Sequence, residues 1–465
     1  MKIILVIADT FRRDHISAYG DAPWGRIHTP SFAKFAARSA VFDNAFIGSF
    51  PTGPNRRDTI LGYCPRGQGF NEWTEFTPED TTFVRDLTAA QIPSMLISDV
   101  ENTVARKPFL YREFTAWTLN RGQEGAPCCM DENVPLVFPV PHELIRYTAK
   151  NWHQILTTRA HRRVETDWFA PGTYSLAIEW LERNYRRENF FLWLDTFDPH
   201  EPWDPPQYYI DRYDPGYTGR VFEAPPGGFR KKMGITDREL RHIWARYAGE
   251  VTMVDTWFGR LMETIERLGI LDDTVVLFTS DHGTPLAGPG DFDMPRKPVV
   301  VGADGMIASA GRPTQKPVQY FPLSINTTRI PLMIRVPGMT RGKRIKAITQ
   351  PWDLSATILD AFGLPIPERV IGRSLLPLVS GKGGKIRDAA VSGTGSLAQA
   401  TDTRWMYSVW RGERPASLFD LKNDPACERN VIEDEPAAAR RMHAAIVAHL
   451  RRQGVSDDAI AAYRP

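Results

Sequence analysis

Five short stretches of the chain are apolar at nearly every position. They read KIILVIAD, SMLISD, FFLWLD, TVVLFTSD and PLMIRV and begin at residues 2, 94, 190, 274 and 331. A strand with one face in water alternates apolar and polar residues, whereas continuous apolar runs are typical of strands buried on both faces. These runs therefore predict the centre of a sheet that is covered by helices on both sides.

Segments with helical spacing lie between these runs, at residues 31–39, 173–187 and 239–268. In the longest segment apolar residues recur every three or four positions from Ile243 to Ile265, and Gly269 stands where a helix is expected to end. Strands that alternate with helices favour an α/β fold. We expect a large mixed, mostly parallel sheet sandwiched by helices.

The pattern changes beyond about residue 372. The stretches RWMYSVW and ASLFDL resemble short strands around a GERP turn, and residues 435–453 have the spacing of an amphipathic helix. A chain of 465 residues also exceeds what one hydrophobic core usually supports. We predict a catalytic α/β domain over residues 1–374 and a small α+β subdomain over residues 375–465. Residues 105–170 and 205–235 have weak periodicity and are expected to be insertions at the rim of the site.

Composition and charge exclude several classes of protein. The chain has 57 Lys and Arg against 55 Asp and Glu, and a net charge of +2 does not suggest a nucleic-acid binder. Apolar runs long enough to cross a membrane are absent from the sequence. The first apolar run ends directly in Asp9 without the features of a signal peptide, and four cysteines are too few for a disulfide scaffold. We expect a cytoplasmic protein that binds neither nucleic acid nor membranes.

Four of the five apolar runs end in an aspartate, namely Asp9, Asp99, Asp195 and Asp281. In open α/β sheets ligands bind beyond the carboxyl ends of the strands. Asp9 lies in ADTFRRDH, and Asp281 and His282 lie in TSDHG. Two carboxylates and an imidazole suit a divalent cation, so these motifs together predict a metal site. The alternative for His282 is a loop histidine with a structural role.

The ordered motifs resemble the sulfatase and phosphonate monoester hydrolase branch of the alkaline phosphatase superfamily. The first strand with ADTFRRDHISAYG, the long helix followed by TSDHG, the segment FDPHEPWDPP, the segment ITQPWDLSATILDAFGLP and the C-terminal SLFDLKNDPACERNV occur in the order of that family. The resemblance implies an alkaline-phosphatase-like fold and a metal-dependent ester hydrolase. It also implies Asp9, Asp281 and His282 as metal ligands.

The chain departs from this family at the nucleophile. The family signature has five positions: first Cys or Ser, then any residue, then Pro, then Ser or Ala, and last Arg. The Cys or Ser at the first position is oxidised to formylglycine. Here TGPNR occupies residues 52–56, with Gly62 at the expected distance. Thr52 carries a methyl group on its β-carbon and cannot become an aldehyde, and Cys64 lacks the signature spacing. Threonine nucleophiles occur elsewhere in the superfamily, so we expect Thr52 to attack directly and to ligate the metal.

The resemblance also assigns roles to two further residues of the site. Arg56 matches the arginine beside the nucleophile and would stabilise charge there, while the neighbouring Arg57 is expected to form a surface salt bridge. His200 matches a histidine that contacts the substrate anion or the leaving oxygen. Its alternative is a loop histidine packed between Pro199 and Pro202.

The resemblance also implies a lysine after the DHG motif and a bound metal. Lys297 is preferred over Lys316 because it lies nearer to His282 in the sequence. Thr10 replaces an acid that many sulfatases use as a ligand, which implies a metal site with fewer acidic ligands. We therefore expect manganese or zinc, with calcium or magnesium as alternatives.

Three functions are compatible with these residues. The first is a hydrolase of phosphodiesters or phosphonate monoesters, the second a sulfatase with an unmodified threonine, and the third an inactive relative that binds an anion. A complete set of metal ligands argues against the third. The substrate is expected to be a small anionic ester. Trp203 and Trp257 could line its pocket or belong to the core, and the oligomeric state is left open, a homo-oligomer included.

Overall fold

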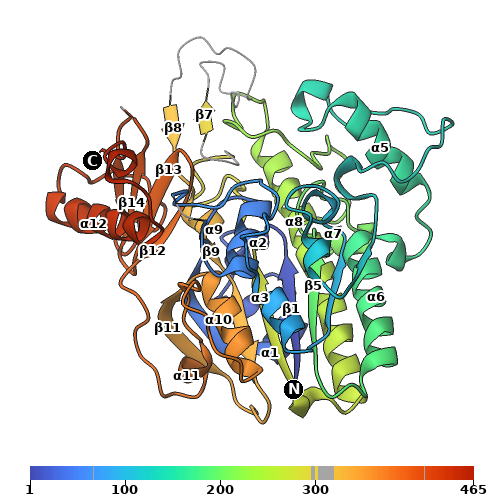
Figure 1. Ribbon diagram of the computed structural model, residues 1–465. Helices are drawn as coiled ribbons and strands as arrows, with labels where there is room; N and C mark the ends of the chain where they lie inside the picture. The colour runs from blue at the N-terminus through green and yellow to red at the C-terminus, as the bar shows by residue number, and fades with distance from the viewer. Residues whose placement is uncertain (66, 295–298, 302–318, 413, 465) are drawn as a thin grey trace.

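The computed structural model describes residues 1–65, 67–294, 299–301, 319–412 and 414–464. A nine-stranded sheet crosses the main domain in the order β11-β2-β10-β6-β1-β5-β3-β4, with β9 paired to β2 (Figure 1). Its strands are β1 (Lys2–Ala8), β2 (Ala40–Phe46), β3 (Ser94–Ser98), β4 (Ala116–Leu119), β5 (Phe190–Thr196), β6 (Thr274–Ser280), β9 (Arg329–Ile330), β10 (Leu332–Arg335) and β11 (Lys343–Thr349). The pairs β1–β5, β1–β6, β3–β5, β3–β4 and β2–β11 are parallel, whereas β9 and β10 run antiparallel to their neighbours. The predicted mixed, mostly parallel sheet is confirmed.

Helices cover both faces of this sheet. The main-domain helices are α1 (Pro30–Ala36), α2 (Thr52–Leu61), α3 (Phe83–Ala89), α4 (Glu101–Val104), α5 (Ala149–Ala160), α6 (Phe169–Asn184), α7 (Gln207–Ile210), α8 (Asp237–Arg267), α9 (Ile325–Thr328), α10 (Trp352–Ala361) and α11 (Leu376–Val379). A separate antiparallel pair is formed by β7 (Val299–Val301) and β8 (Gln319–Phe321).

The central strand β1 shows why its sequence is apolar throughout. Ile4 and Val6 pack into the core beneath α1, α6 and α8, and Ile3 and Leu5 pack into the core beneath α2, α3 and α10. Successive side chains of a strand point to opposite faces, so a strand covered on both sides has no position for a polar residue. The first polar side chain after the run, Asp9, therefore marks the end of the strand.

The longest helix, α8, spans 31 residues and confirms the helix predicted over residues 239–268. It begins with a capping box, in which Thr236 Oγ1 accepts from the Glu239 amide and the Glu239 side chain accepts from the Thr236 amide. It ends before Gly269, whose φ of +70° suits the residue that follows a helix. Its buried face packs on the sheet and on α6 and α7.

One expectation about the insertions was incomplete. Residues 105–170, which we expect to be an insertion with weak periodicity, contain the edge strand β4 and the 12-residue helix α5. Thr148 caps α5 by accepting from the Asn151 amide. Helix α5 buries only a few side chains, including Trp152 and Ile155, and so narrow an apolar face leaves little periodicity in the sequence.

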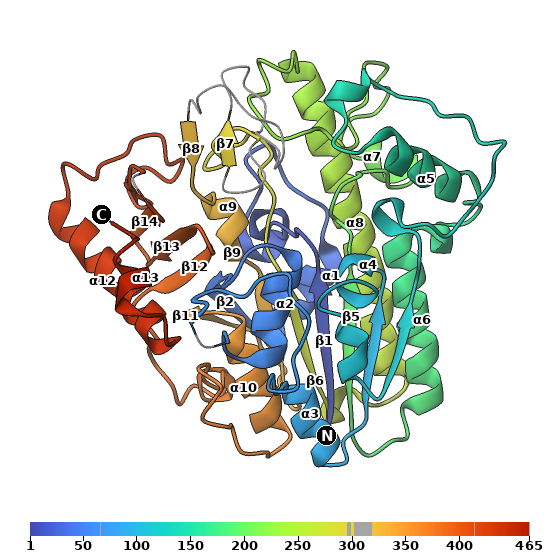
Figure 2. The same ribbon diagram turned by 45° about the horizontal axis from the view of Figure 1, so that its top comes forward.

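The C-terminal part forms the predicted small α+β subdomain. Strands β12 (Ala390–Thr394), β13 (Leu397–Thr401), β14 (Trp405–Trp410) and β15 (Ser417–Asp420) form an antiparallel sheet, and α12 (Pro436–Arg452) packs on it, followed by α13 (Asp457–Ile460). The predicted boundary at residue 375 stays a prediction. In both views the subdomain and the insertion that carries α5 lie on opposite sides of the molecule (Figure 2).

The subdomain also contacts the loop that leads into α2. The Phe50 amide donates to the Gly393 carbonyl over 2.9 Å, and the Gly393 amide donates to the Gly48 carbonyl over 3.0 Å. Strand β12 thus fixes the backbone two residues before Thr52. Within the part of the chain that the structure describes, none of the helices has the length and apolar character needed to cross a lipid bilayer.

The contact between β12 and this loop requires a glycine at position 393. A Cβ added there would lie 2.2 Å from the Leu397 carbonyl oxygen and 2.7 Å from the Phe70 ring. We expect Gly393→Ala to lower the free energy of unfolding by about 1–3 kcal/mol, measured by denaturant titration. Gly384→Ala is the control, because a Cβ there meets no atom within 4 Å. Equal stability of the two variants would contradict the role given to this contact.

Candidate active site

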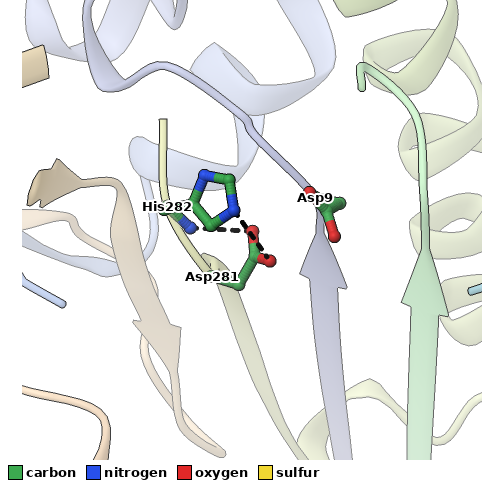
Figure 3. Close-up of side chains that lie close together, drawn as sticks. All are labelled: Asp9, Asp281 and His282. Carbon is green, nitrogen blue, oxygen red and sulfur yellow. Dashed lines mark hydrogen bonds and ion pairs between the residues drawn. The ribbon is translucent and has the colours of Figure 1, made fainter. Parts of the chain in front are cut away.

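Three neighbouring strands bring polar side chains together at the carboxyl edge of the sheet. Asp9 follows β1, Asp281 and His282 follow β6, and Asp195 lies near the end of β5. Figure 3 shows Asp9, Asp281 and His282 at the ends of adjacent strands. One ligand atom of each lies within 4.8 Å of the others, and all three residues are buried. The sequence motifs that predicted a metal site therefore meet in space.

The hydrogen bonds of these residues leave suitable donor atoms available. Asp281 Oδ1 accepts from the amides of Thr10 and His282, over 3.1 and 2.7 Å. Neither oxygen of Asp9 has a hydrogen-bond partner in the described residues, although Arg56 Nη1 lies 3.2 Å from Oδ2. His282 Nδ1 lies 2.8 Å from the Gly283 carbonyl oxygen and donates to it, which places the lone pair on Nε2. The donor set fits a divalent cation.

Burial and mutual repulsion shift the pKa values of the Asp9 and Asp281 carboxyl groups. Burial and the neighbouring Asp281 raise the pKa of Asp9 well above its usual value. Burial also acts to raise the pKa of Asp281, but His282 and Arg56 lower it below the usual value. Two buried carboxylates this close repel each other, and a divalent cation bound by both would offset that repulsion.

Among the residues that the structure describes, Arg56 is the cation that contacts Asp9, Asp195 and Asp281. Its side chain is fully buried, and Nε and Nη2 donate to the two oxygens of Asp195 over 2.9 and 2.8 Å. Nη1 donates to Asp281 Oδ2 over 2.6 Å and lies 3.2 Å from Asp9. Burial lowers the pKa of Arg56, but the three carboxylates more than offset this effect. When all three are ionised, two negative charges remain uncompensated, which is the charge of a divalent cation.

Thr52 is the first residue of α2, one helical turn before Arg56. Its Oγ1 lies 3.4 Å from His282 Nε2, and its carbonyl accepts from Arg56 Nη1 over 3.2 Å. The amide groups at the N-terminus of a helix favour negative charge. The Thr52 hydroxyl therefore lies at a helix N-terminus, next to the predicted metal ligands.

The loop before Thr52 is fixed by a buried carboxylate further along α2. Asp58 Oδ1 accepts from Ser49 Oγ and from Asn71 Nδ2, each over 2.8 Å, and Oδ2 accepts from the Ser49 amide. Asp58 thus joins the loop and the segment after α2 to the helix itself. The position of the Thr52 side chain depends on this bracing.

The comparisons with known proteins agree with this geometry. Residues 156–364 match the Sulfatase family model. The chain is 27% identical over 287 residues to an arylsulfatase of Clostridium perfringens, and 24% identical over 469 residues to a choline-sulfatase of Rhizobium meliloti. These alignments cover 56% and 93% of this chain and 52% and 82% of those proteins. The chain spans about half the length of the arylsulfatase.

The fold matches solved structures over nearly its whole length. A phosphonate monoester hydrolase of Silicibacter pomeroyi superposes with a TM-score of 0.70 and 20% identity, covering 97% of this chain and 95% of that one. The phosphonate monoester hydrolase of Agrobacterium radiobacter gives 0.67 and 19%, covering 98% and 96%. The family model and these structures support a place for the chain in the sulfatase branch of the alkaline phosphatase superfamily. Its site brings two acids, an imidazole and an arginine together around a threonine.

The remaining predicted site residues are His200 and one of two lysines, Lys297 or Lys316. His200 follows β5, with Nδ1 2.7 Å from the Glu201 carbonyl oxygen and Nε2 3.4 Å from Arg146 Nη1. Its role stays a prediction. Lys297 and Lys316 both lie outside the described residues.

The two tryptophans considered for the substrate pocket and the arginine expected at the surface are all buried. Trp203 and Trp257 are buried in the core and donate to Pro199 and Glu165. The expectation that Arg57 forms a surface salt bridge was wrong. Arg57 is buried, donates to Asn71 and the Thr74 carbonyl, and pairs with Asp80.

Two residues that position the site were missed from the sequence. Asp195 was noted only as an acid at a strand end, and its bidentate contact identifies it as the residue that orients Arg56. Asn71 follows a glycine-rich segment with no local signal of its contact with Asp58. The fourth strand-end acid, Asp99, accepts from the Phe197 amide and Thr173 and so serves the fold.

The site predicts the outcome of metal removal and return. After chelation, adding Mn²⁺ or Zn²⁺ at a hundred times its Kd should stabilise the folded protein by about 2.7 kcal/mol, because the ion binds only the folded state. Asp281→Asn and His282→Ala should lose this stabilisation while keeping the fold. The measurements are thermal unfolding and elemental analysis of the bound metal.

The control for these variants is Asp273→Asn, which changes an exposed acid at the opposite end of β6 whose carboxylate lies 3.8 Å from Lys2 Nζ. This variant should bind metal as the unmodified protein does. Unchanged metal content in Asp281→Asn and His282→Ala would show that the ion, if any, binds elsewhere.

Proposed function

We propose that this protein is a metal-dependent hydrolase of phosphodiesters or phosphonate monoesters that uses Thr52 as its nucleophile. The observation that carries the proposal is the position of Thr52 Oγ1, 3.4 Å from His282 Nε2 at the start of α2, with Arg56 behind it. Two of the solved structures that share this fold are phosphonate monoester hydrolases.

Asp9, Asp281 and His282 would hold the metal, with Thr52 as a further ligand; Mn²⁺ or Zn²⁺ is proposed, and Ca²⁺ or Mg²⁺ is the alternative. When bound, such an ion lowers the pKa of a coordinated hydroxyl and balances the charge that develops on the ester. Arg56 supplies a fixed positive charge on the same side, oriented by Asp195.

The proposed reaction has two displacements at phosphorus. Thr52 loses its proton to solvent as Oγ1 bonds to phosphorus, and the bond from phosphorus to the leaving oxygen breaks. The leaving oxygen takes up a proton, for which His200 in its protonated form is the candidate donor. Water then attacks phosphorus, the bond to Oγ1 breaks, and Thr52 regains a proton. The products are the leaving alcohol and the phosphate monoester or phosphonate.

A threonine suits phosphorus better than sulfur for a chemical reason. The hydrated aldehyde of ordinary sulfatases expels sulfate by cleavage at its own carbon, a route closed to Thr52. A sulfated threonine would need water to attack sulfur, whereas a phosphorylated threonine is opened by the same in-line displacement that formed it.

Sulfate ester hydrolysis is the second candidate. It is favoured by the sequence relatives, which include an arylsulfatase and a choline-sulfatase. The metal ligands and Arg56 suit a sulfate ester as well as a phosphate ester, so the two candidates differ in the fate of the intermediate on Thr52. Direct comparison of nitrophenyl phosphodiester, phosphonate and sulfate substrates separates them.

The role of Thr52 leads to a kinetic prediction. Thr52→Ala should lower kcat by at least about a thousandfold, because no other group replaces the nucleophile. Thr52→Ser keeps the hydroxyl and should retain about a tenth of the activity or more. The assay is release of nitrophenolate from methyl p-nitrophenyl phosphate with saturating Mn²⁺ or Zn²⁺.

The matched control is Thr59→Ala, another buried threonine of α2, whose hydroxyl donates to the Asn55 carbonyl within the helix. It should keep kcat close to that of the unmodified enzyme. Undiminished turnover by Thr52→Ala would overturn the proposed mechanism.

A further inference from the structure

One large aromatic side chain lies half-exposed beside the proposed nucleophile. Trp73 is 40% exposed, whereas Trp203 and Trp257 are 1% and 4% exposed. A Cβ placed on Gly53 would lie 2.5 Å from Trp73 Cζ3 and 2.6 Å from Cε3. The six-membered ring of the indole therefore lies against the backbone of the residue that directly follows Thr52.

The segment that carries Trp73 is attached to α2 on both sides of it. Before it, Asn71 Nδ2 donates to Asp58 over 2.8 Å. After it, the Thr74 carbonyl accepts from Arg57 Nη1 over 3.1 Å, and Arg57 Nη2 lies 3.3 Å from Asp80. The buried Arg57 thus holds this segment in place. A ring whose backbone is fixed loses little entropy when a ligand packs on it.

The direction of attack decides which part of a substrate can reach this ring. The attacking and leaving oxygens lie roughly in line on opposite sides of phosphorus. The leaving group therefore departs on the side away from Thr52 and away from α2. A substituent that stays on phosphorus lies beside the nucleophile, which is where Trp73 is.

We propose that Trp73 is a specificity-determining residue that stacks on a flat ring carried by the retained substituent of the substrate. The inference rests on the proposed function, since it assumes attack by Thr52 at phosphorus. Phosphodiesters and phosphonate monoesters carry a retained organic group. A sulfate monoester has none, because its sulfur carries only terminal oxygens besides the leaving group. An aromatic surface at this position therefore favours phosphorus substrates with an aryl or sugar ring on the retained side.

The test keeps the leaving group constant and changes the retained group. Phenyl and methyl p-nitrophenyl phosphate both release nitrophenolate. The unmodified enzyme should prefer the phenyl compound in kcat/KM, and Trp73→Ala should lose about three- to tenfold on it with little change on the methyl compound, the size expected for an aromatic contact. Trp73→Phe should keep most of the preference. A glucosyl p-nitrophenyl phosphate distinguishes a sugar from an aryl ring.

A binding measurement supplies a readout that does not depend on turnover. Phenylphosphonate should bind the metal-loaded enzyme more tightly than methylphosphonate by calorimetry, and Trp73→Ala should remove the difference. Trp117→Ala is the control, because Trp117 is 47% exposed but lies on β4, the edge strand three places from β1 in the sheet order.

The outcomes separate this inference from the proposed function. An equal loss on the phenyl and methyl diesters, or no loss on either, would overturn the role of Trp73 while leaving phosphodiester hydrolysis intact. An unmodified enzyme that cleaves nitrophenyl sulfate and neither diester nor phosphonate would overturn the proposed function and the inference with it. Loss of the preference in Trp117→Ala as well would show an indirect effect.

Discussion

The buried guanidinium of Arg56 is the contact on which the active site depends. It binds Asp195 through two hydrogen bonds and contacts Asp281 and Asp9 through a third nitrogen, so one side chain of α2 joins the ends of β5, β6 and β1. Removing one partner of a buried ion pair costs about 3–5 kcal/mol, because the other charge is left without compensation. This contact fixes α2 on the carboxyl edge of the sheet, and Thr52, one turn earlier, is positioned as a consequence.

The same contact accounts for the electrostatics of the site. One guanidinium among three carboxylates leaves two negative charges that a divalent cation would balance. The oxygens of Asp9, which accept no hydrogen bond from the described residues, lie where such an ion is expected. The positive φ of Thr10, +53°, is an uncommon conformation for a threonine, and the Thr10 amide donates to Asp281. Backbone, helix and C-terminal subdomain together hold these groups: β12 fixes Gly48 and Phe50, and Asp58 fixes Ser49.

The parts of the fold that the sequence predicts well are those with a strong local pattern. Strand β1 and helix α8 are apolar on the faces that they bury, and Asp9 and Asp281 end uninterrupted apolar runs, so their position at the sheet edge follows from the pattern. The burial of Arg57 was not predicted because it depends on contacts with Thr74 and Asp80, which lie 17 and 23 residues later in the chain. Trp73 and Asn71 carry no local signal for the same reason: their contacts with α2 exist only in the tertiary structure.

The proposed reaction proceeds in two displacements through Thr52. The most direct measurement is the stereochemical outcome at phosphorus, using a chiral thiophosphate diester hydrolysed in isotopically labelled water. Each in-line displacement inverts the configuration, so attack by Thr52 followed by attack of water predicts net retention. Net inversion would mean that water attacks the ester directly, and would contradict the account.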